Sequence, residues 1–167
     1  ITEENIDGEY CPECGSGLSI PKLKKEEEYK PVGAALTVEK ILESLGKDPV
    51  ICRRGPNRWE VEEGSAKIFF TYSESGFIIG DAYICMLPKQ NIGSLYEYLL
   101  KENYDLESVA FSVNNQNIVL SMIIYDHYLT FETGLEEFKA LVKKADYYDN
   151  YLIETYGALP RLEDSDD

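Results

Sequence analysis

The sequence predicts an α+β domain built on one antiparallel β-sheet. Apolar stretches rich in β-branched and aromatic residues follow one another with only short turn segments between them. Short links of this kind join antiparallel strands, whereas parallel strands need a crossover of about a dozen residues or more. Three further stretches carry apolar residues at helical spacing. The predicted order is therefore α-βββ-α-ββ-α, a meander followed by a hairpin, with helices packed on the sheet.

The composition fits one globular domain with a short appendage. The 167 residues are 44% hydrophobic, which is enough for a substantial core. Acidic residues outnumber basic ones by 31 to 16, and the formal charge of -15 repels phosphate backbones, so we expect no nucleic-acid partner. The acidic surface favours solubility or a carrier that keeps an apolar partner dissolved. No apolar run is long enough to span a membrane and no signal-peptide pattern opens the chain, so we expect a cytoplasmic protein without membrane contact.

The composition divides the chain into three parts. Residues 1–33 form an N-terminal appendage, in which a charged run closed by Pro31 predicts a solvated linker. Residues 34–158 carry the apolar stretches and are expected to form the α+β domain. Residues 159–167 are mostly acidic beyond Leu162, and we expect them to be a disordered tail.

The first predicted elements are a helix and a meander of three strands. Thr37 is a suitable N-cap for a helix over residues 38–45, whose apolar residues form one stripe, and Gly46 suits the position after its end. Residues 49–53 then lead into a turn at residues 55–57. The three strands follow at residues 59–63, 66–72 and 77–87.

The strand at residues 77–87 is apolar at both alternating positions, and so is the stretch at residues 118–124. A strand with one buried face alternates apolar and polar residues instead. Both faces of this sheet therefore need cover, which the chain's own helices, a second copy or a bound polypeptide can provide.

The second half of the domain is predicted as helix, hairpin and helix. The middle helix begins at Asn91 or Ser94, after Pro88 has ended the preceding strand. A hairpin over residues 109–125 turns at Asn115-Gln116. The last helix covers residues 135–156, and Gly157 and Pro160 end it.

The segment Cys11-Pro12-Glu13-Cys14-Gly15 is similar to one knuckle of a zinc ribbon. Two thiolates at this spacing bind one edge of a metal, and the glycine permits the tight turn. A structural zinc needs four ligands, so Cys11 and Cys14 form an incomplete site whose second pair lies upstream of Ile1, in a twin chain, or nowhere. Cys52 and Cys85 complete it poorly, because Cys85 is interpreted as a small apolar core residue of a strand. A structural zinc is the one cofactor considered, and no other is expected.

No catalytic pattern stands out. His127, beside Asp126, is the single histidine, but neighbouring residues on an extended chain point to opposite faces. No nucleophile elbow, phosphate loop or dinucleotide fingerprint occurs in the sequence. We therefore expect a protein that is not an enzyme.

The element order, together with Trp-Glu-Val-Glu at 59–62, Lys-Ile-Phe-Phe at 67–70 and the strand that ends at Pro88, resembles the YbjN-like family. That family shares the fold of type III secretion chaperones of the Tir-chaperone (CesT) type. The resemblance covers about residues 37–156 and lies in element order and apolar pattern. It implies a small acidic domain, usually dimeric, that binds a partner polypeptide on exposed apolar surface.

Two sets of residues are candidates for these contacts. The partner-binding candidates are Phe70, Tyr72, Ile79 and Tyr83. The candidates for a homodimer interface, from the stripe of the middle helix, are Leu95, Tyr96 and Leu99. The alternative is that all seven are ordinary core residues. A second functional hypothesis is a small-ligand or regulatory sensor domain with a pocket against the tyrosine-rich sheet.

Overall fold

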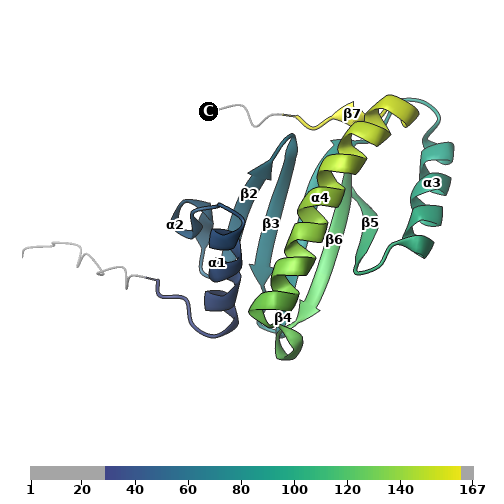
Figure 1. The fold of residues 1–167 in the computed structure, drawn as a ribbon. Helices are drawn as coiled ribbons and strands as arrows, with labels where there is room; N and C mark the ends of the chain where they lie inside the picture. Colours follow the sequence, from purple (N-terminus) through teal and green to yellow (C-terminus); the bar gives the residue numbers. More distant parts are fainter. Residues whose placement is uncertain (1–28, 163–167) are drawn as a thin grey trace, which may run out of the picture. The chain divides into compact units, whose positions relative to one another are not determined.

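The computed structural model describes residues 29–162, and the chain divides into two compact units, residues 1–30 and residues 31–167. The second unit contains four α-helices and a sheet of seven strands in its described part (Figure 1). The helices are α1 (Ala34–Ser44), α2 (Pro49–Cys52), α3 (Ile92–Asp105) and α4 (Phe131–Tyr156). The strands are β1 (Arg53–Gly55), β2 (Arg58–Glu63), β3 (Ala66–Tyr72), β4 (Phe77–Met86), β5 (Val109–Asn114), β6 (Asn117–Tyr125) and β7 (Leu159–Pro160).

The predicted α+β fold with one antiparallel sheet is confirmed. The strand order is β1-β2-β3-β4-β6-β5, and every neighbouring pair is antiparallel. The ten-residue strand β4 lies at the centre, between β3 and β6. The hairpin β5–β6 occupies the residues that the sequence predicted for it.

Helices α1 and α4 lie on one face of the sheet, and α4 crosses the central strands diagonally (Figure 1). The strands turn alternate side chains toward these helices, as the alternating burial of β3 and β4 shows. The sheet contributes to the core Trp59, Val61, Ile68, Phe70, Ile78, Ala82, Ile84, Val109, Phe111, Ile118, Leu120 and Met122.

Two glycines bring α4 close to its neighbours. A Cβ atom at Gly80, in the middle of β4, would lie 2.9 Å from both Leu141 Cδ2 and Phe70 Cε1. A Cβ atom at Gly134, on the first turns of α4, would lie 2.5 Å from Ile41 Cδ1 of α1. Between these points Phe138 of α4 stacks on Phe70, with ring centroids 4.2 Å apart. Side chains at either glycine would push α4 away from the sheet or from α1.

A partly buried ion pair joins α1 to the edge of the sheet. Arg53 donates to Glu39 through Nε (2.6 Å to Oε1) and Nη2 (2.8 Å to Oε2), and the indole of Trp59 donates to Oε1 at 3.0 Å. These bonds, the one from Arg53 above all, hold the pKa of Glu39 below its usual value. The carboxylate is therefore charged, and its acceptors are satisfied although the residue is buried.

The first helices differ from their prediction. Helix α1 begins at Ala34, and Thr37 lies inside it, where its hydroxyl donates to the Gly33 carbonyl at 3.3 Å instead of capping the helix. Gly33, with φ of 58°, provides the non-helical start that a side-chain cap was expected to provide. Residues 49–52 form the short helix α2, because the Asp48 side chain accepts from Val50 N at 2.9 Å and caps it.

Helix α4 begins earlier than predicted, and it ends where it was predicted to end. The helix begins at Phe131, four residues before the predicted start, because Thr130 and Thr133 form a capping box. Gly157 ends the helix in the left-handed conformation, as predicted. Leu159 and Pro160, which the sequence assigned to the tail, instead pair with β4 as the strand β7. Residues 163–167 lie outside the described residues.

Replacing Gly80 with alanine should lower the free energy of unfolding by about 1–3 kcal/mol, because the added methyl group overlaps Leu141 and Phe70. Chemical denaturation measures this change. Gly93→Ala is the matched control, because nothing lies within 4 Å of its Cβ position in α3. Equal stability of Gly80→Ala and the wild type would contradict the close packing of α4.

Candidate functional site

The face of the sheet opposite α1 and α4, here called the open face, carries apolar side chains at its centre. Its central residues are Phe69 of β3, Ile79 and Tyr83 of β4 and Ile123 of β6. They alternate in sequence with the core residues of the same strands and therefore point away from those helices. In the described part of the chain, α1 and α4 cover the other face, while α3 packs against β5 and the tyrosines of α4.

The apolar residues of the open face pair across the strands. Ile79 lies opposite Ile123, and Ile123 keeps 64% of its surface exposed. Phe69 and Tyr83 meet edge to face with centroids 5.6 Å apart. Phe77 and Tyr125 make a further ring contact at 5.3 Å at the start of β4. The result is an apolar strip along β4, interrupted at Asp81.

Asp81 places a carboxylate in the middle of this strip. It lies between Phe69 and Ser121 in the register of β3, β4 and β6, and the Ser121 hydroxyl donates to its Oδ1 at 2.6 Å. The residue is half-buried. The open face therefore combines an apolar strip with one acidic acceptor at its centre.

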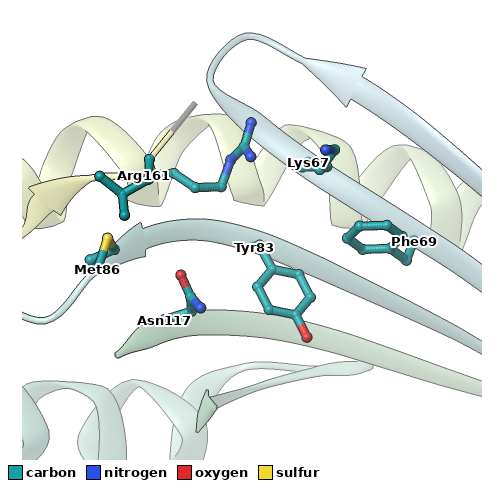
Figure 2. A pocket seen from close by; sticks show the side chains of 7 residues that line it. Lys67, Phe69, Tyr83, Met86, Asn117 and Arg161 are labelled. Carbon is teal, nitrogen blue, oxygen red and sulfur yellow. The ribbon is translucent and has the colours of Figure 1, made fainter. Parts of the chain in front are cut away.

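The strip ends at a hollow of about 410 Å³ beside the end of β4 (Figure 2). Tyr83 and Asn117 lie on the adjacent strands β4 and β6, and Lys67 and Phe69 lie on β3. Arg161 and Leu162, which follow β7, complete the wall together with Met86. Lys67 is also ion-paired with Glu60 at 3.3 Å.

A second hollow, of about 370 Å³, lies at the other end of the strip and includes Ile123, Tyr125 and Tyr128. The centroid of the exposed His127 ring lies 4.7 Å from that of Tyr125, with the two rings tilted, and its Nε2 is 3.9 Å from Asp126 Oδ1. The Tyr72 hydroxyl donates to Asp126 Oδ2 at 2.7 Å, and this bond raises the pKa of Tyr72. The Asp126 carboxylate therefore binds Tyr72 at the end of the sheet.

Helix α3 presents a separate apolar stripe. Tyr96, Leu100 and Tyr104 follow one another at i, i+4 and i+8 and are 41%, 71% and 91% exposed. Leu95 and Leu99 are buried and attach the helix to the domain. A groove of about 250 Å³ lies between α3 and the edge strand β5, and its lining is mainly apolar.

Asn103 of α3 binds the outer edge of β5. Its side-chain amide nitrogen donates to the Phe111 carbonyl at 3.1 Å, and its amide oxygen accepts from the Phe111 N–H at 2.6 Å. These are the two bonds that a further strand would make to Phe111. Asn103 therefore occupies the position of a neighbouring strand at this edge, which protects it from strand addition.

The structure separates the four partner-binding candidates. Ile79 and Tyr83 lie on the open face. Phe70 and Tyr72 lie on the opposite face, where Phe70 is completely buried under Phe138. The signal that assigns the faces is present in β3, because polar Lys67 and Thr71 share the alternation of Phe69 and mark its side as the open one. Phe69, Asp81 and Ile123 also lie on the open face, although they were not among the predicted candidates.

The dimer candidates and the cysteines are also placed only in part. Of the three dimer candidates, Tyr96 alone is well exposed. Cys11 and Cys14 lie outside the described residues, and within residues 29–162 no group of three or more potential metal-ligating side chains occurs. Cys85 is a buried core residue, and burial raises the pKa of its thiol to about 12.

None of the helices described here is both long and apolar enough to cross a membrane.

Comparison with known proteins identifies the fold. No family model matches the chain, and no curated protein matches its sequence. YbjN from E. coli superposes with a TM-score of 0.58 at 14% identity, over 78% of this chain and 98% of that one. A chain of the heterodimeric ExoU–SpcU complex from the type III secretion system of Pseudomonas aeruginosa gives 0.55 at 13% identity, covering 71% and 99%. The Yersinia pestis type III secretion chaperone SycH, in complex with a fragment of YscM2, gives 0.52 at 14% identity, covering 68% and 98%. The chain therefore has the fold of YbjN and type III secretion chaperones.

Replacing Asn103 with leucine should lower the free energy of unfolding by about 1–3 kcal/mol, because the Phe111 N–H and carbonyl lose their partners. Asn103→Asp keeps an acceptor for the N–H but no donor for the carbonyl, so its stability should lie between those of the wild type and Asn103→Leu. Urea denaturation of the three proteins measures this order. A leucine variant as stable as the wild type would contradict the role of Asn103.

Proposed function

We propose that this chain is a non-enzymatic, chaperone-like domain that holds a segment of a partner polypeptide on the open face. The observation that carries the proposal is the apolar strip of Phe69, Ile79 and Tyr83, which are half-buried, and Ile123, which is exposed, on a sheet whose other face is filled by its own helices. Contiguous apolar surface of this kind marks an interaction site in a folded protein.

The chemistry of the strip favours a polypeptide partner. Side chains on one face of a strand recur at every second residue, about 6.6 Å apart, and alternate side chains of an extended segment that runs along the strand have the same spacing. Burial of apolar surface contributes about 25 cal/mol per Å², so several large side chains are needed to offset the cost of ordering a flexible segment. Asp81 supplies one position at which a donor of the partner can be recognised.

The structural neighbours support a protein partner. They include the SycH chaperone in complex with a YscM2 fragment and the HopA1–SchA chaperone–effector complex. A shared fold does not fix function, so the argument rests on the open face.

Replacing Ile123 with glutamate should remove peptide binding while leaving the fold intact, because the side chain is 64% exposed. A displayed library of random dodecapeptides is selected on the wild-type protein, and the affinity of the best peptide is measured by fluorescence anisotropy. We expect Ile123→Glu to weaken that affinity at least about tenfold, since a charge then faces the apolar side chains of the peptide.

The matched control is Val50→Glu, which introduces the same group at an exposed apolar residue of α2 outside the open face. It should bind the selected peptide as the wild type does. Failure to select any peptide, or equal losses in both variants, contradicts the proposed function.

We also propose that the chain forms a homodimer through the exposed stripe of α3. Tyr96, Leu100 and Tyr104 present apolar surface on one side of this helix, and a twofold axis would pair the stripe with itself. Tyr96 was predicted for this interface, whereas Leu95 and Leu99 attach α3 to its own domain.

Sedimentation equilibrium tests the dimer. The wild-type chain should have the mass of a dimer, and Leu100→Glu should have that of a monomer, because two copies of the new charge would face each other across the axis. Val50→Glu again serves as the control and should remain dimeric. A wild-type monomer at high concentration would contradict this interface.

The alternative of a small-ligand sensor remains a prediction. Its place would be the hollow of about 410 Å³, where Tyr83, Asn117, Lys67 and Arg161 bring polar groups beside Phe69 and Met86.

A further inference from the structure

The central strand β4 is longer than its pairing with β3. The pairing with β3 ends at Lys67 and Tyr83, whereas β4 continues to Met86. On the side that β3 leaves free, β7 pairs antiparallel with β4, with Pro160 opposite Cys85 and Leu159 opposite Met86. The chain's own C-terminal segment therefore occupies an edge that would otherwise accept another strand.

Residues 159–162, here called the clasp, have few contacts. β7 is only two residues long, and Pro160 has no N–H to donate to the ladder. Leu159 is an exposed residue, and Leu162 is 73% exposed. The side-chain hydrogen bond of the clasp joins Arg161 Nε to the Ser65 carbonyl at 3.3 Å. Little apolar surface would be lost if the clasp left β4.

The residues before the clasp are attached much more firmly. Gly157 takes the left-handed conformation that ends α4, with φ of 67°. Ala158 is buried, and its N–H donates to the Leu152 carbonyl at 3.2 Å. Local opening can therefore release the clasp after Ala158 without unfolding α4.

The clasp covers part of the proposed binding surface. Arg161 and Leu162 line the hollow of about 410 Å³ together with Phe69 and Tyr83 of the open face. Figure 2 shows Arg161 beside the strands that carry Phe69 and Tyr83. When the clasp leaves, this end of the apolar strip becomes continuous with the free edge of β4. An extended segment could then use both side-chain and backbone contacts.

Charge links the clasp to α4. The Ser65 hydroxyl donates to Asp149 Oδ2, while the Ser65 carbonyl accepts from Arg161. Burial raises the pKa of Asp149, the nearby Asp146 raises it further, and the positive charge of Arg161 opposes the shift. Asp149 Oδ1 is buried and has no hydrogen-bond partner among the described residues. A cation at the position of Arg161 is thus favoured by the acidic groups beneath it.

We propose that the clasp is a displaceable internal occupant of the binding surface, which leaves β4 when a partner strand pairs there in its place. This inference rests on the proposed function and adds its regulation. The partner strand should resemble the clasp, with a basic residue at the position of Arg161 and an apolar residue at that of Leu162. A tethered segment competes at an effective concentration of roughly millimolar, so it excludes weak binders and yields to stronger ones.

The first test changes how tightly the clasp is held in the full chain. The probe is a fluorescein-labelled peptide with the sequence of residues 157–163, added to the protein and followed by anisotropy. Arg161→Glu removes the bond to Ser65 and places a third carboxylate near Asp146 and Asp149. We expect this variant to bind the probe about tenfold more tightly than the wild type, because the internal competitor is released.

The second test locks the clasp. Pro160→Cys places a thiol opposite Cys85, and paired residues of antiparallel strands have Cα atoms about 4.5–5.5 Å apart, within the range that a disulfide bridges. Reduced Pro160→Cys should bind the probe as the wild type does, and the oxidised form should bind it about tenfold more weakly. Pro160→Ser, treated with the same oxidant, controls for the other cysteines.

Hydrogen exchange of the wild-type chain gives a readout that needs no partner. Segment 159–162 should exchange before residues 77–83 of β4, since the clasp opens locally. Unchanged probe binding by Arg161→Glu, or exchange of the clasp only together with β4, overturns the inference. If library-selected peptides bind oxidised and reduced Pro160→Cys equally, displacement of the clasp is contradicted while the proposed function stands. If no peptide is selected, the proposed function is contradicted, and hydrogen exchange and probe binding still test whether the clasp can be displaced.

Discussion

The arrangement of this domain depends on how closely α4 approaches the centre of the sheet. Gly80 of β4 leaves no room for a side chain beneath Leu141, and Phe138 stacks directly on Phe70. A single helix of 26 residues, about 39 Å long, therefore fills one face together with α1. Because α1 and α4 occupy that face, they do not cover the apolar residues of β4 that point to the other face.

The two outer edges of the sheet are protected against the addition of another strand. Asn103 binds the backbone of the outer strand β5, and the opposite edge is the three-residue strand β1. Both devices disfavour the addition of another strand at the outside of the sheet. At the end of β4, by contrast, the cover is a two-residue strand that contains proline. The least protected backbone edge thus lies beside the apolar strip.

Much of the fold could be predicted from sequence, because apolar periodicity and turn residues determine strand and helix positions locally. The hairpin of β5 and β6 and the glycine that ends α4 are examples. The faces of β4 could not be assigned, since Ile78 and Ile79 are chemically alike and only packing against α4 distinguishes them. The roles of Asn103 and of β7 depend on contacts between residues distant in sequence, which no local pattern records. The face of Phe70, by contrast, could have been assigned from the sequence, since polar Lys67 and Thr71 lie on the other face of β3.

The carboxylate of Asp81 gives the open face a means of discrimination. Its Oδ1 accepts from the Ser121 hydroxyl, and Phe69 lies opposite it on β3. A purely apolar occupant would strip water from this charge without replacing it, at a cost of several kcal/mol that apolar burial alone must outweigh. An occupant with a lysine, arginine or amide donor at that one position avoids the penalty. If the open face binds a polypeptide as proposed, we therefore expect it to favour segments that carry a hydrogen-bond donor at the position of Asp81 over purely apolar ones.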